Sequence, residues 1–377
     1  MPRVLLLHAT VGTGHKTAAN ALRKAFEMRQ PGDVGVVDTL DLTPSFFHKT
    51  YSRAYIDVTN NAPLAWGLFY KQTDRAPELA ELTNNLRKLM ESVSLVDLED
   101  LLETFKPEII ICTHFLPLNM LLRKKRKGDI RLPLYCVVTD HAVHTFWVYP
   151  DIDGYFVASA MMREQLVERG ISSNIIHVTG IPVDPQIATP KDKSAVRVQH
   201  DLPREGFLIT LFAGGIQNER VRGIANSILK SNHRGTLVLA AGRNETLGDE
   251  VRNLQRGSTM DIRVYGYINF VDDLVAASDV VITKAGGLIV SEILARGTPL
   301  IVIDPILGHE EWNADYVVCQ GAGVQVRMSE SVPILVDNLL RHPIWLDELR
   351  KGAVAAGKPR AAQDIAGIVI QQFSGQR

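Results

Sequence analysis

Residues 279–323 read DVVITKAGGLIVSEILARGTPLIVIDPILGHEEWNADYVVCQGAG, and this stretch alternates strand and helix patterns in the order that decides the fold. An apolar strand, 280–282, runs into the glycine turn Ala285-Gly286-Gly287 and then into a helix that carries Glu292. The glycine backbone therefore lies at the carboxyl end of a parallel strand. Free N–H groups and the helix dipole favour an anion there, such as a phosphate. Glu292, one helical turn further, can accept hydrogen bonds from a ribose diol.

A second loop, Gly308-His309-Glu310-Glu311, follows the next apolar strand, 300–303. Loops at the carboxyl ends of neighbouring parallel strands open toward the same crevice. A phosphate site, a ribose acceptor and further polar groups together indicate a nucleotide-sugar site.

Length and composition set the outer limits of the function. A chain of 377 residues favours two domains. The formal net charge of -1 gives no reason to expect a nucleic-acid partner, so any attraction to a membrane must come from a local patch. The three cysteines lack zinc-ligand spacing and suit a reducing cytoplasm. We find neither a signal-peptide core nor a run long enough to cross a membrane, and expect a cytoplasmic protein.

The alternation of short apolar strands and helices predicts an α/β fold of two Rossmann-like domains. The polar linker after 180–185 divides them into 1–183 and 184–359, and the closing helix 360–377 is expected to pack back on the first domain. An aromatic-rich stretch, 43–87, is predicted to be an insertion of helices and loops. The expected strands are 4–7, 34–37, 109–112, 134–138, 155–157, 175–178, 208–212, 237–240, 262–264, 280–282, 300–303 and 324–326.

The first strand is followed by Gly12-Thr13-Gly14-His15-Lys16. As a dinucleotide fingerprint this loop is a weak variant, because Ala18 replaces the third glycine. As a phosphate-binding P-loop it fails, because His15 separates Gly14 from Lys16. It does resemble, residue for residue, the Gly-x-Gly-His motif of lipid glycosyltransferases.

Together with residues 284–313, this motif resembles the monogalactosyldiacylglycerol synthase and processive diacylglycerol glucosyltransferase family, relatives of MurG. The resemblance implies the glycosyltransferase-B fold, in which two Rossmann-like domains face each other. It also implies inverting transfer of a hexose, galactose or glucose, from a UDP-sugar to diacylglycerol, with no obligatory metal or other cofactor.

The resemblance further assigns roles to individual residues. His15 is the expected base, because a neutral histidine suits proton removal from an acceptor hydroxyl, and Gly12 and Gly14 lie on the acceptor side. The nucleotide and its phosphates are expected to contact Gly214, Gly215, Ile268, Ala285, Gly286, Gly287, Ser291 and Glu292. Relatives usually have Gln where this chain has His309, so the sugar is left open while His309 and Glu310 remain the expected sugar contacts.

The stretch 137–147, VVTDHAVHTFW, resembles the family's Thr-Asp…His…Trp segment. Asp140 could orient His15 or His144, or serve as the base itself, and His144 and Trp147 are expected on the acceptor side. His141 and His144 also allow a metal interpretation, but no further ligand pattern supports one.

Five cations, Arg123-Lys124-Lys125-Arg126-Lys127, end an apolar stretch. They are either a solvated helix end or a patch attracted to an anionic membrane surface. With the aromatic segment 46–70 in the same domain, we expect peripheral membrane association.

Two alternative functions remain open. A MurG-like transferase or a UDP-sugar epimerase would keep the fold and act on another substrate. A non-catalytic nucleotide-sugar sensor would bind UDP-sugar without turnover. A dehydrogenase is a poor fit, because no catalytic tyrosine–lysine pair accompanies the first glycine loop and Asp38 alone is available at the second strand.

Overall fold

A computed structural model describes residues 2–10, 12–29, 32–75, 97–230, 234–255 and 260–375. The chain divides into two compact units, which we call the first and second domain. The first domain comprises Met1–Gln186, Ile306–Trp312 and Lys358–Arg377, and the second comprises Ile187–Pro305 and Asn313–Gly357. The first division therefore falls close to the predicted boundary after Val183.

The first domain is built on a six-stranded parallel sheet in the order β2-β1-β3-β4-β5-β6. Most of its strands are buried on both faces, which explains their continuous apolar sequences. The strands are β1 (Val4–His8), β2 (Val34–Asp38), β3 (Ile109–Cys112), β4 (Leu134–Val137), β5 (Gly154–Val157) and β6 (Ile176–Val178).

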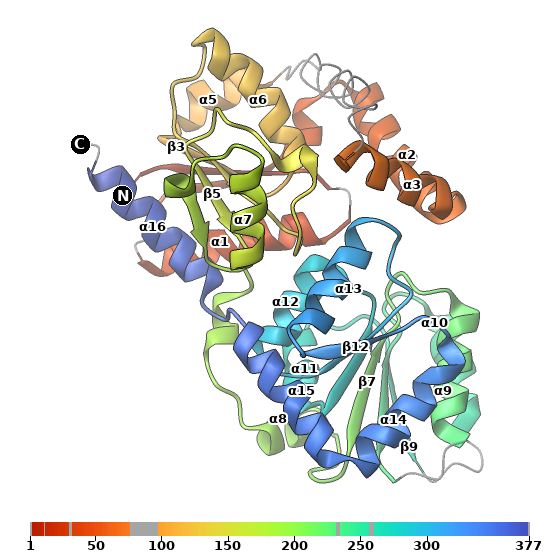
Figure 1. The fold of residues 1–377 in the computed structure, drawn as a ribbon. Coiled ribbons are helices and arrows are strands. Elements are labelled where there is room, and N and C mark those ends of the chain that lie inside the picture. Colours follow the sequence, from red (N-terminus) through yellow and green to blue (C-terminus); the bar gives the residue numbers. More distant parts are fainter. Residues whose placement is uncertain are drawn as a thin grey trace. The chain divides into compact units, whose positions relative to one another are not determined.

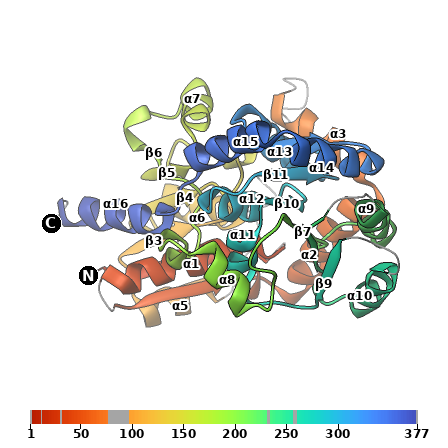
Figure 2. The same ribbon diagram turned by 90° about the horizontal axis from the view of Figure 1, so that it is seen from below.

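Helices cover this sheet, and the last helix of the chain is one of them. In Figures 1 and 2, α16 (Ala361–Gly375) lies beside α1 (Gly14–Arg29). Leu22 and Phe26 of α1 share a core with Ile365 and Val369 of α16. The other helices are α5 (Leu98–Phe105), α6 (Phe115–Lys127), α7 (Ala160–Glu168) and the short η1 (Thr39–Leu42), η3 (Thr145–Trp147) and η4 (Ser173–Ile175).

The aromatic-rich insertion forms two helices in its described part, α2 (Ser45–Asn61) and α3 (Pro63–Arg75), as predicted. Pro63 begins α3, a position that needs no N–H donor. Asp74 connects the end of α3 to the rest of the domain. Its carboxylate accepts hydrogen bonds from both terminal guanidinium nitrogens of Arg169, at 2.8 and 3.1 Å. Residues 76–87 of the predicted insertion lie outside the described residues.

The second domain repeats the plan with a parallel sheet in the order β12-β11-β10-β7-β8-β9. The strands are β7 (Leu208–Phe212), β8 (Thr236–Ala240), β9 (Asp261–Tyr265), β10 (Val280–Thr283), β11 (Leu300–Ile303) and β12 (Gly323–Val326). The helices are α8 (Lys193–Gln199), α9 (Asn218–Lys230), α10 (Glu245–Arg252), α11 (Val271–Ala277), α12 (Gly287–Ala295), α13 (His309–Cys319), α14 (Val332–Arg341) and α15 (Pro343–Ala356), with the short η5 (Pro185–Ala188), η6 (Asn253–Gln255) and η7 (Ser329–Ser331). The first residues of α13 and of η5 belong to segments of the first domain. The prediction of two Rossmann-like domains is confirmed.

Each sheet has one point at which its strand order reverses. In the first domain, β1 lies between β2 and β3, so the chain leaves β1 on one side and returns on the other. In the second domain, β7 lies in the same way between β8 and β10. Doubly wound sheets bind ligands outside the carboxyl ends of the strands at these points. The residues after β1 and β3, and those after β7 and β10, are therefore the first places to look for function.

Candidate active site and nucleotide site

His15 lies at the reversal point of the first domain, on the first turn of α1. Its Nδ1 is 2.9 Å from the carbonyl oxygen of Thr113, the residue that follows β3, and 2.8 Å from Oγ1 of Thr139, which follows β4. The Thr113 hydroxyl in turn donates to the backbone oxygen of His15 at 2.9 Å. Gly12, with φ of +94°, makes the turn that leads into the helix. Three strand ends therefore hold one imidazole.

The surroundings of His15 favour its neutral form. Burial lowers the pKa of His15 from its ordinary value of 6.5, while the charge of Asp140 and the hydrogen bond to Thr113 raise it. His309, in the segment grouped with this domain, and His8 lower the pKa again. The net direction is downward, so the ring is uncharged at neutral pH and able to take a proton. Asp140 therefore acts on His15 through its charge.

His144 and Trp147, the predicted acceptor-side residues, are both buried inside the domain. His144 Nδ1 accepts the N–H of Phe146 at 3.1 Å, and its Nε2 lies 2.9 Å from the carbonyl oxygen of Tyr70. Trp147 packs edge-on against Phe115 at 5.7 Å between ring centroids. These two residues therefore contribute to the packing of η3 and α3, and their role on the acceptor side stays a prediction.

The metal interpretation of this region has no support in the described structure. Both ring nitrogens of His144 already have hydrogen-bond partners. Over the described ranges, no group of three or more His, Cys, Asp or Glu side chains is arranged to hold a metal ion.

The reversal point of the second domain brings together the two predicted glycine turns. Gly215, with φ of +73°, follows β7, and Gly286 caps α12 after β10. Lys284 connects the two turns, because its Nζ donates to the backbone oxygen of Gly215 at 3.0 Å. The buried amide of Asn313 donates to the oxygen of Ala285 at 2.9 Å and fixes the second turn. The site thus combines glycine backbone, the amino end of α12 and one cation.

Ser291 and Glu292 lie further along α12. The Ser291 hydroxyl donates back to the oxygen of Gly287 at 2.8 Å, so it belongs to the helix itself. Glu292 follows it and is half-buried. The ribose contact of Glu292 and the nucleotide contact of Ser291 stay predictions.

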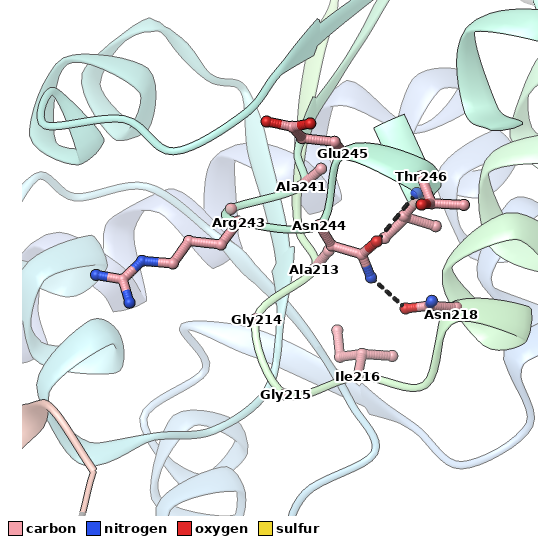
Figure 3. Close-up of a pocket in the computed structure, with 12 residues that line it drawn as sticks. Ala213, Gly214, Gly215, Ile216, Asn218, Ala241, Arg243, Asn244, Glu245 and Thr246 are labelled. Atoms are coloured by element: carbon pink, nitrogen blue, oxygen red, sulfur yellow. Dashed lines mark hydrogen bonds between the residues drawn. The ribbon is translucent and has the colours of Figure 1, made fainter. Parts of the chain in front are cut away.

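A cavity of about 660 Å³ opens between the loops that follow β7 and β8 (Figure 3). Gly214 and Gly215 form one wall, and Arg243 and Asn244 belong to the other. The Asn244 amide donates to Asn218 at 2.8 Å, while the Arg243 side chain extends away from that pair (Figure 3). The guanidinium carbon of Arg243 lies 5.5 Å from the ring centroid of Tyr267, the neighbour of Ile268.

Four of these residues were missed by the sequence analysis, namely Lys284, Arg243, Asn244 and Asn218. The usable signal for Arg243 and Asn244 is that they lie in the loop after an apolar strand, 236–240, which parallel pairing places beside β7. Lys284 directly follows β10 in the same way.

The predicted sugar loop folds on itself. Gly308 has φ of +97°, and the Glu311 carboxylate accepts its N–H at 3.0 Å. The carboxylate of Glu310, which is only 8% exposed, accepts the N–H of Ile306 at 2.6 Å. Glu310 therefore supports the loop conformation, and His309 begins α13.

The cationic run at the end of α6 is partly neutralised. Lys124 lies 2.7 Å from Glu99, Lys125 lies 2.6 Å from Asp153 and Arg126 lies 2.8 Å from Asp151. At least three of the five predicted membrane cations therefore have carboxylate partners. The exposed apolar side chains of the α2–α3 insertion are more prominent, with Phe46 82%, Leu64 73% and Leu68 61% exposed. Across the described segments, no helix combines the length and the apolar character that crossing a membrane requires.

Comparison with known proteins defines the class first. Residues 211–355 match the C-terminal domain of glycosyltransferase family 28. In fold, the chain is similar to MurG of Acinetobacter baumannii, with a TM-score of 0.62 at 14% identity over 98% of this chain and 100% of that one. It is also similar to UDP-GlcNAc 2-epimerase of Neisseria meningitidis, with a TM-score of 0.60 at 14% identity over 98% and 99%. The protein is a glycosyltransferase with the glycosyltransferase-B type of fold.

The family follows from the first domain and from full-length relatives. Residues 15–183 match the monogalactosyldiacylglycerol (MGDG) synthase model. The chain is 26% identical over 373 residues to the processive diacylglycerol beta-glucosyltransferase of Bacillus cereus strain B4264, covering 98% of this chain and 94% of the relative. The enzyme of the same name from Bacillus cytotoxicus is 26% identical over 377 residues, covering 100% and 95%. The predicted resemblance is confirmed, and the two family models together with the full-length relatives support a UDP-sugar-dependent hexosyltransferase.

Proposed function

We propose that this protein transfers a hexose from a UDP-sugar to the hydroxyl of diacylglycerol, with inversion at the anomeric carbon. The observation that carries the proposal is His15, a neutral imidazole at a reversal point with Nδ1 fixed by Thr113 and Thr139. The relatives' names supply the lipid, and the match to glycosyltransferase family 28 supplies the chemistry.

The reaction is a single displacement. The acceptor hydroxyl gives its proton to His15 while its oxygen forms a bond to the anomeric carbon. The bond from that carbon to the diphosphate breaks at the same time, and UDP leaves with the electron pair. Attack opposite to the leaving group inverts the configuration. Holding base and acceptor in reach supplies much of the acceleration in reactions of this kind.

In this proposal, groups of the second domain stabilise the negative charge of the departing UDP. The Gly214–Gly215 turn, the amino end of α12 and the Lys284 ammonium form a positive environment, and Ile268 and Glu292 are assigned to the uracil edge and the ribose. These groups can stabilise the leaving diphosphate, and we propose that no metal is obligatory. Chelation of divalent ions should therefore leave turnover unchanged.

Peripheral membrane association is the second part of the proposal. It rests on Phe46, Leu64 and Leu68, which are exposed on α2 and α3, because exposed apolar side chains partition into the interface of a bilayer. The cations at Arg123–Lys127 contribute less than their number indicates, since three of them are paired.

The membrane part is tested with neutral vesicles and with vesicles containing anionic phosphatidylglycerol, each at low and high salt. Changing Phe46 and Leu68 to serine should reduce the salt-resistant binding. Ile344→Ser, at an exposed apolar site on α15, is the matched control and should bind like the wild type. Binding that depends on anionic lipid alone would contradict the apolar contribution, and no binding at all would contradict peripheral association.

The reaction is tested by incubating the full chain with diacylglycerol vesicles and UDP-glucose or UDP-galactose in separate reactions. Lipid mass spectrometry should reveal diacylglycerol carrying one added hexose, and NMR of the product should give the β-anomer from the α-linked donor. Epimerised or transferred sugar on a water-soluble product would support the first alternative function. Binding of UDP-sugar without any product would support the sensor.

A further inference from the structure

The contacts at His15 Nδ1 determine where the ring proton lies. The Thr113 carbonyl oxygen, 2.9 Å away, can only accept a hydrogen bond. Nδ1 must therefore carry a proton for this contact to be favourable. Thr139 Oγ1, at 2.8 Å from Nδ1, then accepts from the same N–H and directs its own proton to the Thr113 carbonyl at 3.3 Å. All three groups are satisfied in this one arrangement.

The opposite tautomer leaves a conflict. If Nε2 carried the proton, the Nδ1 lone pair would face the Thr113 carbonyl lone pairs at 2.9 Å. Thr139 could donate to Nδ1 in that case, but the carbonyl contact would remain repulsive. Thr113 and Thr139 are both buried, so water does not readily take the place of the missing donor.

We propose that Thr113 and Thr139 are positioning residues that hold His15 in the Nδ1–H tautomer and so make Nε2 the atom that accepts the acceptor's proton. This inference rests on the proposed function of His15. Thr113 acts twice, because its carbonyl accepts from the ring and its hydroxyl pins the His15 main chain. The contact of Thr139 comes from its side chain alone, so a substitution at this position can remove it.

Several charged and polar groups surround the His15 ring. Asp140 and the Thr113 hydrogen bond favour the charged ring, whereas burial, His309 and His8 oppose it. His114 lies edge-on to His15 at 4.4 Å between ring centroids, and its own Nδ1 accepts the N–H of Leu116. His114 is therefore engaged as a helix cap and does not donate to His15 through that nitrogen.

The test compares Thr139→Val, which removes the hydroxyl, with Thr139→Ser, which retains it. Thr298→Val is the matched control, because Thr298 is also buried and also donates to a backbone carbonyl, that of Val275 in the second domain. Two readouts are used on the full chain. Nitrogen-15 shifts of the histidine rings report the tautomer, with His15→Gln identifying the signals, and the pH dependence of kcat/KM reports the base.

We expect Nδ1 of wild-type His15 to be protonated and Nε2 to be bare. Thr139→Val should lower kcat by about 3- to 10-fold, the usual effect of one lost hydrogen bond. It should also move the acid limb of the pH profile to lower pH, because one acceptor that stabilises the charged ring is gone. Thr139→Ser should restore both, and Thr298→Val should change neither.

A wild-type ring protonated at Nε2 would overturn the proposal. So would a Thr139→Val protein whose ring shifts and acid limb match the wild type, since Thr139 would then be structural only. The ring shifts are measured without turnover, so the tautomer result stands even if no glycolipid is formed. Absence of product in the wild type would instead count against the proposed function.

Discussion

Both domains place a glycine turn where the strand order of the sheet reverses, after β1 in the first domain and after β10 in the second, and the two turns lead to different groups. In the first domain, the turn at Gly12–Gly14 leads to His15, whose Nδ1 lies within hydrogen-bond distance of Thr113 and Thr139. In the second domain, the turn at Gly286 leads to bare helix backbone beside Lys284. Under the proposed function, the turn after β1 presents a side chain that takes up a proton, whereas the turn after β10 presents helix backbone and a cation to an anion.

The largest effect is expected at the first turn. His15→Ala should lower kcat by about 10²- to 10⁴-fold, the usual contribution of a general base, while UDP affinity stays unchanged because the anion site is in the other domain. Turnover and calorimetric UDP binding measure the two halves of this prediction. If turnover stays within a few-fold, His15 is structural and Asp140 becomes the leading base.

The second effect is expected at the anion site. Glu292→Ala should weaken UDP binding by about 1–3 kcal/mol through the loss of charge-assisted hydrogen bonds to the ribose. Glu348→Ala, on the exposed face of α15, is the control and should bind UDP normally. Unchanged affinity in calorimetry would remove Glu292 from the site.

A smaller effect is expected from the cation that joins the two turns of the second domain. Lys284→Met should weaken UDP binding by about 1 kcal/mol at low ionic strength and by less in high salt, because a half-exposed charge is screened. Lys284→Arg retains the charge and serves as the comparison. A loss for Lys284→Met that does not depend on salt would mean that Lys284 acts through the Gly215 backbone contact instead.

The smallest effect is a difference in pH response between the domains. Burial lowers the pKa of His8, His15 and His114 in the first domain below 6.5. As the pH falls below 6.5, the unfolded chain takes up protons before the folded domain does, so the free energy of unfolding of the first domain decreases.

Hydrogen exchange at pH 7 and pH 5, followed peptide by peptide and corrected for intrinsic exchange rates, should reveal this loss in the first domain. In the second domain, burial raises the pKa of Asp273 but its hydrogen bonds with Lys191 and His200 outweigh it, and the net pKa is lowered from 3.8. That contribution is lost only at more acid pH. Equal loss of protection in both domains between pH 7 and pH 5 would contradict the prediction.

The fold was accessible from sequence because its strands are short, apolar and closely bounded by turn residues. Strands such as Ile109–Cys112 and Leu208–Phe212 have the predicted limits, since buried parallel strands need continuous apolar sequence. These signals are local, and local signals survive without knowledge of the rest of the chain.

The parts of the site that were missed depend on distant neighbours. Thr139 contacts His15 although the two residues are 124 positions apart in the sequence, and neither local sequence pattern predicts this hydrogen bond. His144 resembled a site residue, yet both of its nitrogens serve the packing of η3 and α3. The cations at Lys125 and Arg126 were counted without Asp153 and Asp151, which fold back to pair with them.

The position of α16 has a consequence for the order in which the protein matures. Ile365, Ala366 and Val369 belong to the core of the first domain, although they follow the whole second domain in the sequence. A ribosome releases the amino-terminal end first, but this core stays incomplete until the helix Ala361–Gly375 has emerged. The second domain ends at Gly357 and can finish earlier. The domain that is translated first is therefore the one that closes last.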